Sequence, residues 1–267
     1  MNKRWLITGA GSGLGRALAS AALARGDRVA VTMRGGDDLK GALVYRLDLQ
    51  DGAALGQAVT TADRELGGID MLVNNAGYGL VGAVEEASDA ELRDQFEINF
   101  FAAMTAMCTV LPMMRKRRSG HIVNISSVSG LVGWPSLGLY SASKFALEGA
   151  SETLALEVAP LGIKVTLVEP GGLRTDFSTR SRRHTERVIA DYAATVGESR
   201  RLLAEHAGLE AGDPAKAAAA ILKLADAKDP PLRLLLGEDA LSYTEAKLAK
   251  QREEIEAWKN VTLGIGF

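Results

Sequence analysis

The sequence predicts an α/β fold in which helices cover both faces of a doubly wound parallel sheet. Short apolar runs alternate along the chain with longer amphipathic runs, which is the pattern of repeated strand–helix–strand units. The short runs are rich in Val, Ile and Leu and do not alternate strictly with polar residues, which indicates strands buried on both faces. Right-handed crossovers between such strands produce the doubly wound arrangement.

The expected strands are short runs of β-branched and aliphatic residues. They cover residues 5–8, 28–33, 43–47, 71–74, 121–126, 164–169 and 232–236. The expected helices share an apolar side repeated at helical spacing. They cover residues 16–25, 51–66, 89–117 in two segments, 140–159, 215–228 and 239–259.

The pattern changes after Pro170. Residues 173–212 are polar, rich in Arg and helical in pattern, and we expect no strand among them. The chain contains no Pro/Ser-rich linker and no internal repeat. It is therefore predicted to form one domain over residues 1–267, with a helical lid inserted near 173–212.

The composition excludes several classes of protein. Hydrophobic residues make up 47% and charged residues 24%, which is typical of a globular protein and excludes a disordered or fibrous chain. Lys+Arg 31 against Asp+Glu 33 gives a net charge of -2, so no basic field attracts nucleic acid or an anionic membrane. The single Cys108 excludes an internal disulfide, and the three scattered histidines suggest no metal site.

We expect a cytoplasmic protein. No apolar stretch long enough for a signal peptide precedes the first expected strand. No run of about 18 apolar residues occurs in the chain, so no transmembrane helix is expected.

A glycine-rich segment joins the first expected strand to the first expected helix. It reads T-G-x-x-x-G-x-G over residues 8–15, where G-x-G-x-x-G is the commoner spacing. Glycine is needed where a turn demands positive φ or where a side chain would block a phosphate, and the following helix presents free N–H groups to an anion. The segment predicts a dinucleotide site, although a tight strand-to-helix connection could use the same residues.

The end of the second strand indicates which dinucleotide binds. An acidic residue there would bind the ribose 2′-hydroxyl of NAD. Here the strand ends at Arg34, whose guanidinium can bind a 2′-phosphate, and Asp37 follows a Gly-Gly turn. The sequence favours NADP. NAD remains the alternative if Asp37 turns back toward a 2′-hydroxyl, and Arg34 could also be a solvated strand end.

Tyr140 and Lys144 open an expected helix at i, i+4 spacing, which places the phenol and the ammonium on one face. A free phenol has a pKa of about 10 and is a poor acid–base catalyst at neutral pH. A neighbouring cation favours phenolate and lowers that pKa. The pair could therefore move a proton to or from a carbonyl oxygen.

Six segments together resemble the short-chain dehydrogenase/reductase family over nearly the whole chain. They are the glycine segment, Asn-Asn-Ala-Gly at 74–77, Asn99, Ile-Ser-Ser at 125–127, Tyr140-x-x-x-Lys144, and Pro-Gly-x-x-x-Thr at 170–175. The resemblance implies a Rossmann-like fold and an NAD(P)-dependent oxidoreductase that interconverts a secondary alcohol and a ketone. Residues 230–240 resemble a 17β-hydroxysteroid-dehydrogenase-like subgroup.

The resemblance assigns four catalytic residues. Tyr140 is the general acid/base, and Lys144 lowers its pKa and holds the nicotinamide ribose. Ser127 hydrogen-bonds the substrate oxygen, and its spacing from Tyr140 favours it over Ser126. Asn99 bends its helix and holds a water in a proton relay, or else is a polar residue at a helix irregularity.

The resemblance also assigns the cofactor-binding residues. They are Gly9, Ser12, Gly13, Leu14, Gly15, Arg34, Asp48, Leu49, Asn75, Ala76, Gly77, Tyr140, Lys144, Pro170, Gly171 and Thr175. Thr32-Met33-Arg34 resembles the strand end of NADP-preferring members, but Gly35 and Ser12 stand where many such members carry a basic residue. Asp48 would accept a hydrogen bond from the adenine amino group, or cap the following helix.

Three loops are expected to bind substrate, since loops vary on this scaffold. They are 78–84, 131–139 and the segment after Thr175. They carry the apolar residues Leu80, Val132, Trp134, Leu137 and Phe177, which favours an apolar ketone or secondary alcohol. The lid arginines could bind an acidic substrate instead, but a solvated helical face is the favoured interpretation. These arginines are Arg180, Arg182, Arg183 and Arg187.

Helices at 89–117 and 140–159 carry more apolar residues than one sheet requires, and family members commonly pair these helices. We therefore expect a homo-oligomer, either a dimer or a tetramer.

A nucleotide-sensing protein without turnover is the alternative from another class, but such a protein would be expected to lose Tyr140 or Lys144. The spacing of the glycine segment argues against the epimerases and dehydratases of the extended branch.

Overall fold

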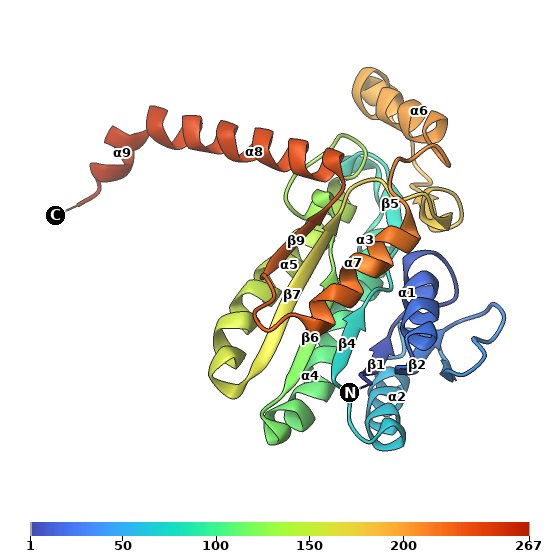
Figure 1. Ribbon diagram of the computed structural model, residues 1–267. Coiled ribbons are helices and arrows are strands. Elements are labelled where there is room, and N and C mark those ends of the chain that lie inside the picture. Colours follow the sequence, from blue (N-terminus) through green and yellow to red (C-terminus); the bar gives the residue numbers. More distant parts are fainter. Residues whose placement is uncertain (1, 267) are drawn as a thin grey trace.

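The computed structural model describes residues 2–266. These residues form a main sheet of seven parallel strands in the order β3-β2-β1-β4-β6-β7-β9 (Figure 1). The strands are β1 (Arg4–Ile7), β2 (Arg28–Met33), β3 (Leu43–Arg46), β4 (Met71–Asn74), β6 (Gly120–Ile125), β7 (Ile163–Pro170) and β9 (Arg233–Leu236). A strand was predicted at each of these places, so the doubly wound sheet is confirmed.

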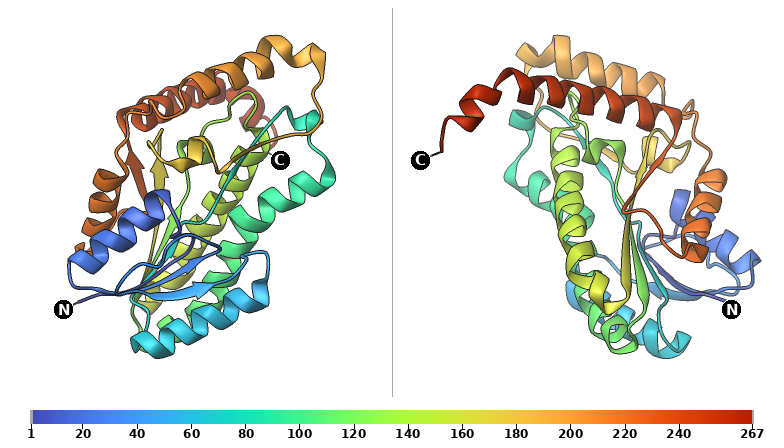
Figure 2. Two further views of the ribbon diagram at one scale, coloured as in Figure 1. Left: turned by 90° about the vertical axis from the view of Figure 1, so that its right-hand side faces the viewer. Right: turned by 60° about the vertical axis from the view of Figure 1, so that its left-hand side comes forward.

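Helices cover both faces of the sheet (Figure 2), and apolar side chains fill the space between them and the sheet. Helices α1 (Gly13–Ala24) and α7 (Pro214–Asp226) cover one face. Helices α2 (Gly52–Leu66), α4 (Ala102–Arg117) and α5 (Gly138–Val158) cover the other. Successive residues of β1 point to opposite faces, so Trp5 and Ile7 join the first core and Leu6 joins the second.

The sheet has its switch point at β1, which pairs with β2 on one side and β4 on the other. Ile7 aligns with Val31 in β2 and with Val73 in β4. The chain leaves β1 and β4 in opposite directions, which opens a crevice beyond their carboxyl ends. Ligands bind at this place in open α/β sheets.

The expectation of no strand between residues 173 and 212 is wrong. Strand β8 (Arg182–His184) pairs in parallel with β5 (Gly79–Val81) in a second, two-stranded sheet. The sequence Arg-Arg-His has little intrinsic strand preference, and the pairing joins segments about a hundred residues apart, so local pattern could not indicate it. The rest of the segment contains short helical turns and α6 (Glu198–Glu205).

The helix predicted at 89–117 is divided by an irregular turn. It consists of α3 (Asp89–Phe96), a π-helical segment (Glu97–Phe101) and α4. No transmembrane helix was expected, yet Asp89–Arg117 is long and apolar enough to cross a membrane by length and composition alone. Its residues Ala106, Met107 and Val110 belong to the core beneath the sheet.

Helix α8 (Glu238–Ala257) extends away from the body and leads to α9 (Lys259–Leu263) (Figures 1 and 2). Near its start, Tyr243 packs edge-on against Trp134 with ring centroids 4.6 Å apart. Farther along, Leu248, Ile255 and Trp258 are exposed.

Candidate active site

A cavity of about 880 Å³ lies beyond the carboxyl ends of the strands, between the body and residues 173–212. This volume suits a small-molecule site. Of the residues assigned to catalysis and cofactor binding, all except Gly15 and Asn99 line it. The assigned residues that meet there are Gly9, Ser12, Gly13, Leu14, Arg34, Asp48, Leu49, Asn75, Ala76, Gly77, Ser127, Tyr140, Lys144, Pro170, Gly171 and Thr175.

The glycine turn requires glycine for two different reasons. Gly9 has φ +68°, and a Cβ there would lie 2.8 Å from the Cα of Ala76, so both its conformation and its surroundings exclude a side chain. A Cβ on Gly15 would lie 2.3 Å from Nδ2 of Asn75. Gly15 therefore lets the first turn of α1 pack against Asn75 and does not itself face the cavity.

Asn75 joins the glycine turn to the end of β4. Its Nδ2 donates to the carbonyl oxygens of Thr8 (2.9 Å) and Gly9 (3.1 Å). The hydroxyl of Thr8 accepts from the backbone N–H of Asn75 at 3.0 Å. Thr8 was not assigned a role from the sequence, although it begins the glycine motif, and these bonds show that it fixes the shape of the turn.

Arg34 and Asp37, the two residues expected to contact the ribose 2′ substituent of the cofactor, occupy different places in the turn after β2. Arg34 is exposed and lines the cavity. Asp37 is outside the cavity lining, and its backbone oxygen accepts from Arg16 at 3.0 Å. Asp38 pairs with Arg46 at 2.8 Å.

Asp48 lies at the cavity wall and does not cap the following helix. Its side chain accepts from the backbone N–H of Gln50 at 3.0 Å. The cap of α2 is Asp51, which accepts from the backbone N–H of Ala54 at 2.9 Å. The helix-capping interpretation of Asp48 is therefore wrong.

Tyr140 and Lys144 lie one turn apart near the start of α5, facing the end of β6. Both are buried, at 7% and 4% exposure, and Lys144 Nζ lies 5.9 Å from the centroid of the phenol ring. Nζ donates to the carbonyl oxygen of Ile125 at 2.7 Å. Ser127 follows β6, and its hydroxyl accepts from the N–H of Ser129 at 3.1 Å.

Burial is the largest influence on the pKa values of Tyr140 and Lys144. Burial raises the pKa of Tyr140 to about 12, partly opposed by a hydrogen bond with Ser127. Burial lowers the pKa of Lys144 to about 8, partly opposed by the carboxylate of Glu148. The expected lowering of the phenol pKa by Lys144 is not seen in this structure, where burial raises the pKa and the opposing contribution comes from Ser127.

Asn99 occupies the π-helical segment and is almost fully buried. Its Nδ2 donates to the carbonyl oxygen of Tyr78 (3.0 Å) and to the hydroxyl of Ser143 (3.1 Å), and its Oδ1 accepts from the N–H of Tyr78 (3.0 Å). A Cβ on Gly77 would lie 3.2 Å from Oδ1 of Asn99 and 3.5 Å from Nζ of Lys144. Asn99 is thus adjacent to the site and holds the irregular turn in place, and the relay role stays a prediction.

Two buried carboxylates behind Lys144 were not singled out from the sequence. Glu148 lies one turn beyond Lys144 on α5, and Glu169 is the penultimate residue of β7, with exposures of 5% and 0%. Burial raises the pKa of both, in Glu169 to about 8, so the pair retains a proton at neutral pH. Arg233 reaches them at 3.3 and 3.4 Å. The i, i+4 spacing from Lys144 was the available signal for Glu148.

A second missed residue, Glu86, fastens residues 173–212 to the body. Its carboxylate, 2% exposed, accepts from the backbone N–H groups of Ala83 and Ile189, both at 2.8 Å. It also pairs with Arg200 at 2.7 Å. Arg200 in turn donates to the hydroxyl of Thr185 at 2.7 Å.

The predicted substrate loops contribute unequally. Trp134, Leu137 and Phe177 line the cavity, whereas Leu80 is buried outside it and Val132 does not reach it. The Phe177 ring lies 5.7 Å from that of Tyr140.

A solvated helical face was the favoured interpretation of the lid arginines, and the structure shows no such face. Arg180, Arg182 and Arg183 line the cavity, and the last two belong to β8. Arg187 is exposed outside the cavity lining. Among residues 2–266, no three His, Cys, Asp or Glu side chains are grouped so as to hold a metal ion.

The short chain dehydrogenase family matches residues 3–186. A solved short-chain dehydrogenase from Streptomyces avermitilis is 43% identical, with a TM-score of 0.94 and full coverage of both chains. The 3-ketodihydrosphingosine reductase of Bacteroides thetaiotaomicron is 42% identical over 87% of each chain. The structure of ElxO with NADP bound is 27% identical, with a TM-score of 0.74, covering 91% of this chain and 100% of that one.

The chain therefore belongs to the short-chain dehydrogenase/reductase family, and the resemblance seen in the sequence is confirmed. It is an oxidoreductase that uses a nicotinamide dinucleotide cofactor.

Proposed function

We propose that the protein is an NADP(H)-dependent oxidoreductase that interconverts a secondary alcohol and a ketone on an apolar substrate. One observation carries this proposal most strongly. A phenol, an ammonium and a serine hydroxyl converge on one cavity, and the glycine turn and Arg34 line the same cavity. The residues thus provide a proton donor and a dinucleotide site in one connected space.

The residues present fit a nicotinamide dinucleotide. The glycine turn leaves the cavity wall free of side chains at Gly9, and α1 begins at Gly13, where its free N–H groups favour a phosphate. Asp48 would accept from the adenine amino group, and Lys144 would hold the nicotinamide ribose. When bound, the cofactor supplies or accepts the hydride.

The protein's own part in the reaction is to hold the carbonyl and move one proton. In the direction of reduction, the phenol of Tyr140 donates its proton to the carbonyl oxygen as hydride adds to the carbon, giving the alcohol. The hydroxyl of Ser127 orients that oxygen. Because burial raises the pKa of Tyr140 to about 12, the phenol holds its proton throughout the neutral range and can act as the donor. In the reverse direction the phenolate accepts the proton of the alcohol.

The preference for NADP depends on Arg34. Arg34→Ala should weaken NADP(H) binding about 10- to 100-fold, because a charge-assisted hydrogen bond to a phosphate contributes about 1.5–3 kcal/mol. NAD(H), which lacks the 2′-phosphate, should bind almost unchanged. Titration of cofactor fluorescence on the purified variant measures both constants. Asp37→Ala is the matched control, since Asp37 lies outside the cavity, and equal weakening of both cofactors by Arg34→Ala would contradict the assignment.

The apolar substrate is supported by the wall around Tyr140. Trp134, Leu137, Phe177, Leu202 and Leu203 line the part of the cavity enclosed by the substrate loops and α6. The relatives whose names state a substrate include a 3-ketodihydrosphingosine reductase of Bacteroides thetaiotaomicron and a retinol dehydrogenase of Homo sapiens.

We also propose that the protein is a cytoplasmic homo-oligomer. Phe101, Phe145 and Leu156, on the two helical segments expected to pair, are 48%, 46% and 76% exposed. Covering such side chains favours association. Light scattering on the purified chain should give the mass of a dimer or tetramer, and a monomer mass would contradict this proposal.

A further inference from the structure

Two arginines of β8 line the active-site cavity without an anionic partner. Several other arginines of residues 173–212 form ion pairs in the described part of the chain. They are Arg180, Arg187, Arg200 and Arg201. Arg182 and Arg183 form none. Arg182 is half-buried and donates from Nη1 to the carbonyl oxygen of Leu203 at 2.8 Å. Arg183 lies over the ring of Tyr78, 4.6 Å from its centroid.

None of the acidic residues that line the cavity forms an ion pair with these arginines, although the charge of Glu210 acts on Arg182. Asp239 accepts from the N–H of Gly172 at 2.8 Å, and Glu210 accepts from the N–H of Gly208 at 2.9 Å. Asp48 accepts from the N–H of Gln50 at 3.0 Å. The lining as a whole holds five cationic side chains against three acidic ones, whereas the whole chain has a net charge of -2. With Arg180 paired to Asp176, four cationic side chains of the lining remain against three acidic ones, a small positive excess on a slightly acidic protein.

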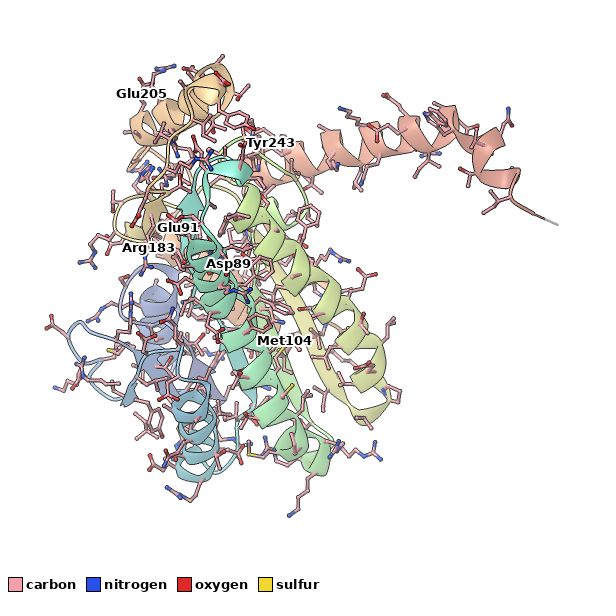
Figure 3. All side chains as sticks on the ribbon, turned by 180° about the vertical axis from the view of Figure 1, so that it is seen from behind. Asp89, Glu91, Met104, Arg183, Glu205 and Tyr243 are labelled. Carbon is pink, nitrogen blue, oxygen red and sulfur yellow. The ribbon has the colours of Figure 1, made fainter. Side chains whose placement is uncertain are left out.

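Arg182 stands close to the proposed reaction centre. Gly79 aligns with Arg182 across the β5–β8 pair, where neighbouring strands are about 4.8 Å apart. A Cβ on Gly79, which would lie on the same face of the pair as the Arg182 side chain, would be 3.3 Å from the ring of Phe177 and 4.0 Å from the ring of Tyr140. Arg183 on β8 and Tyr243 near the start of α8, both labelled in Figure 3, line the same cavity.

We propose that Arg182 and Arg183 bind an oxyanion, a carboxylate or a phosphate, carried by the otherwise apolar carbonyl substrate. This inference rests on the function proposed above. A guanidinium presents planar N–H donors that match either anion, and the partial burial of Arg182 makes a charged partner favourable. The arginines would then orient an amphiphilic substrate, with its anionic group at β8 and its carbonyl at Tyr140.

Calorimetry with non-reacting probes tests the anion site without turnover. The probes are octanoate, octyl phosphate and the neutral octanamide, each titrated into the full chain with NADP present. We expect the better of the two anions to bind about 10- to 100-fold more tightly than octanamide, as for hydrogen bonds to charged groups. Arg183→Gln should reduce this preference, and the double variant with Arg182→Gln should abolish it. The ratio between the two anions identifies carboxylate or phosphate as the preferred group.

Arg187→Gln is the matched control, because Arg187 belongs to the same segment but lies outside the cavity lining and pairs with Glu85. Equal binding of anions and octanamide to the unmodified chain would overturn the proposal. A preference that survives in the double variant would also overturn it. If that variant also lost NADP binding, the arginines would serve the cofactor instead. Because these readouts need no turnover, failure to reduce any ketone would count against the proposed function alone. Arg183 is exposed, so its single variant should fold even if the double variant does not.

Discussion

Tyr140→Phe should lower kcat for ketone reduction by about 100- to 10,000-fold, the usual contribution of a positioned proton donor. Dissociation constants for NADP(H) should change by no more than a few-fold. The substitution removes only the hydroxyl, and the ring keeps its place beside Phe177, 5.7 Å away. A cofactor-consumption assay on ketones, combined with a cofactor-binding titration, measures the two effects separately.

The matched control for this change is Tyr45→Phe. Tyr45 lies on β3 outside the cavity, and its hydroxyl donates to Glu65 at 3.0 Å. It should retain the rate of the unmodified protein. Near-normal turnover in Tyr140→Phe would remove the proposed mechanism. Loss of cofactor binding in the same variant would show that the phenol serves structure rather than proton transfer.

The sheet could be predicted from the sequence because its determinants are local. A buried parallel strand needs a run of apolar residues, a crossover helix needs an apolar side, and both leave a pattern within one window. The glycine turn was predictable for a similar reason, since the positive φ of Gly9 excludes most other residues. Tyr140 and Lys144 followed from spacing, because one helical turn places them on one face.

The parts that could not be predicted depend on contacts between distant segments. Strand β8 exists because residues 182–184 pair with residues 79–81, and nothing in Arg-Arg-His alone favours a strand. The same pairing moves Arg182 and Arg183 from an expected solvated helix to the cavity wall. The raised pKa of Tyr140 likewise comes from burial by the folded chain, which the i, i+4 spacing does not report.

Glu86→Ala should lower the free energy of unfolding by about 3–5 kcal/mol, the cost of removing one partner of a buried ion pair. The carboxylate joins the body at Ala83 to the lid at Ile189 and Arg200, and its loss leaves Arg200, whose Nε already has no partner, without its counter-charge. Thermal unfolding should show a Tm lower by about 10 °C. Limited proteolysis should cut first within residues 173–212, and KM should rise because those residues enclose the substrate.

Glu85→Ala provides the comparison, since Glu85 is the exposed neighbour that pairs with Arg187 at 3.7 Å, and exposed pairs contribute about 0–1 kcal/mol. The two variants differ in burial rather than in chemistry. Although burial alone would raise the pKa of Glu86, hydrogen bonds from Ile189 and Ala83 together with Arg200 hold it below its usual value. The stabilisation by Glu86 is therefore present above the ordinary carboxyl pKa and is lost as the pH falls through the lowered value. If Glu86→Ala were as stable and as protease-resistant as Glu85→Ala at neutral pH, the lid would have to be held by other contacts.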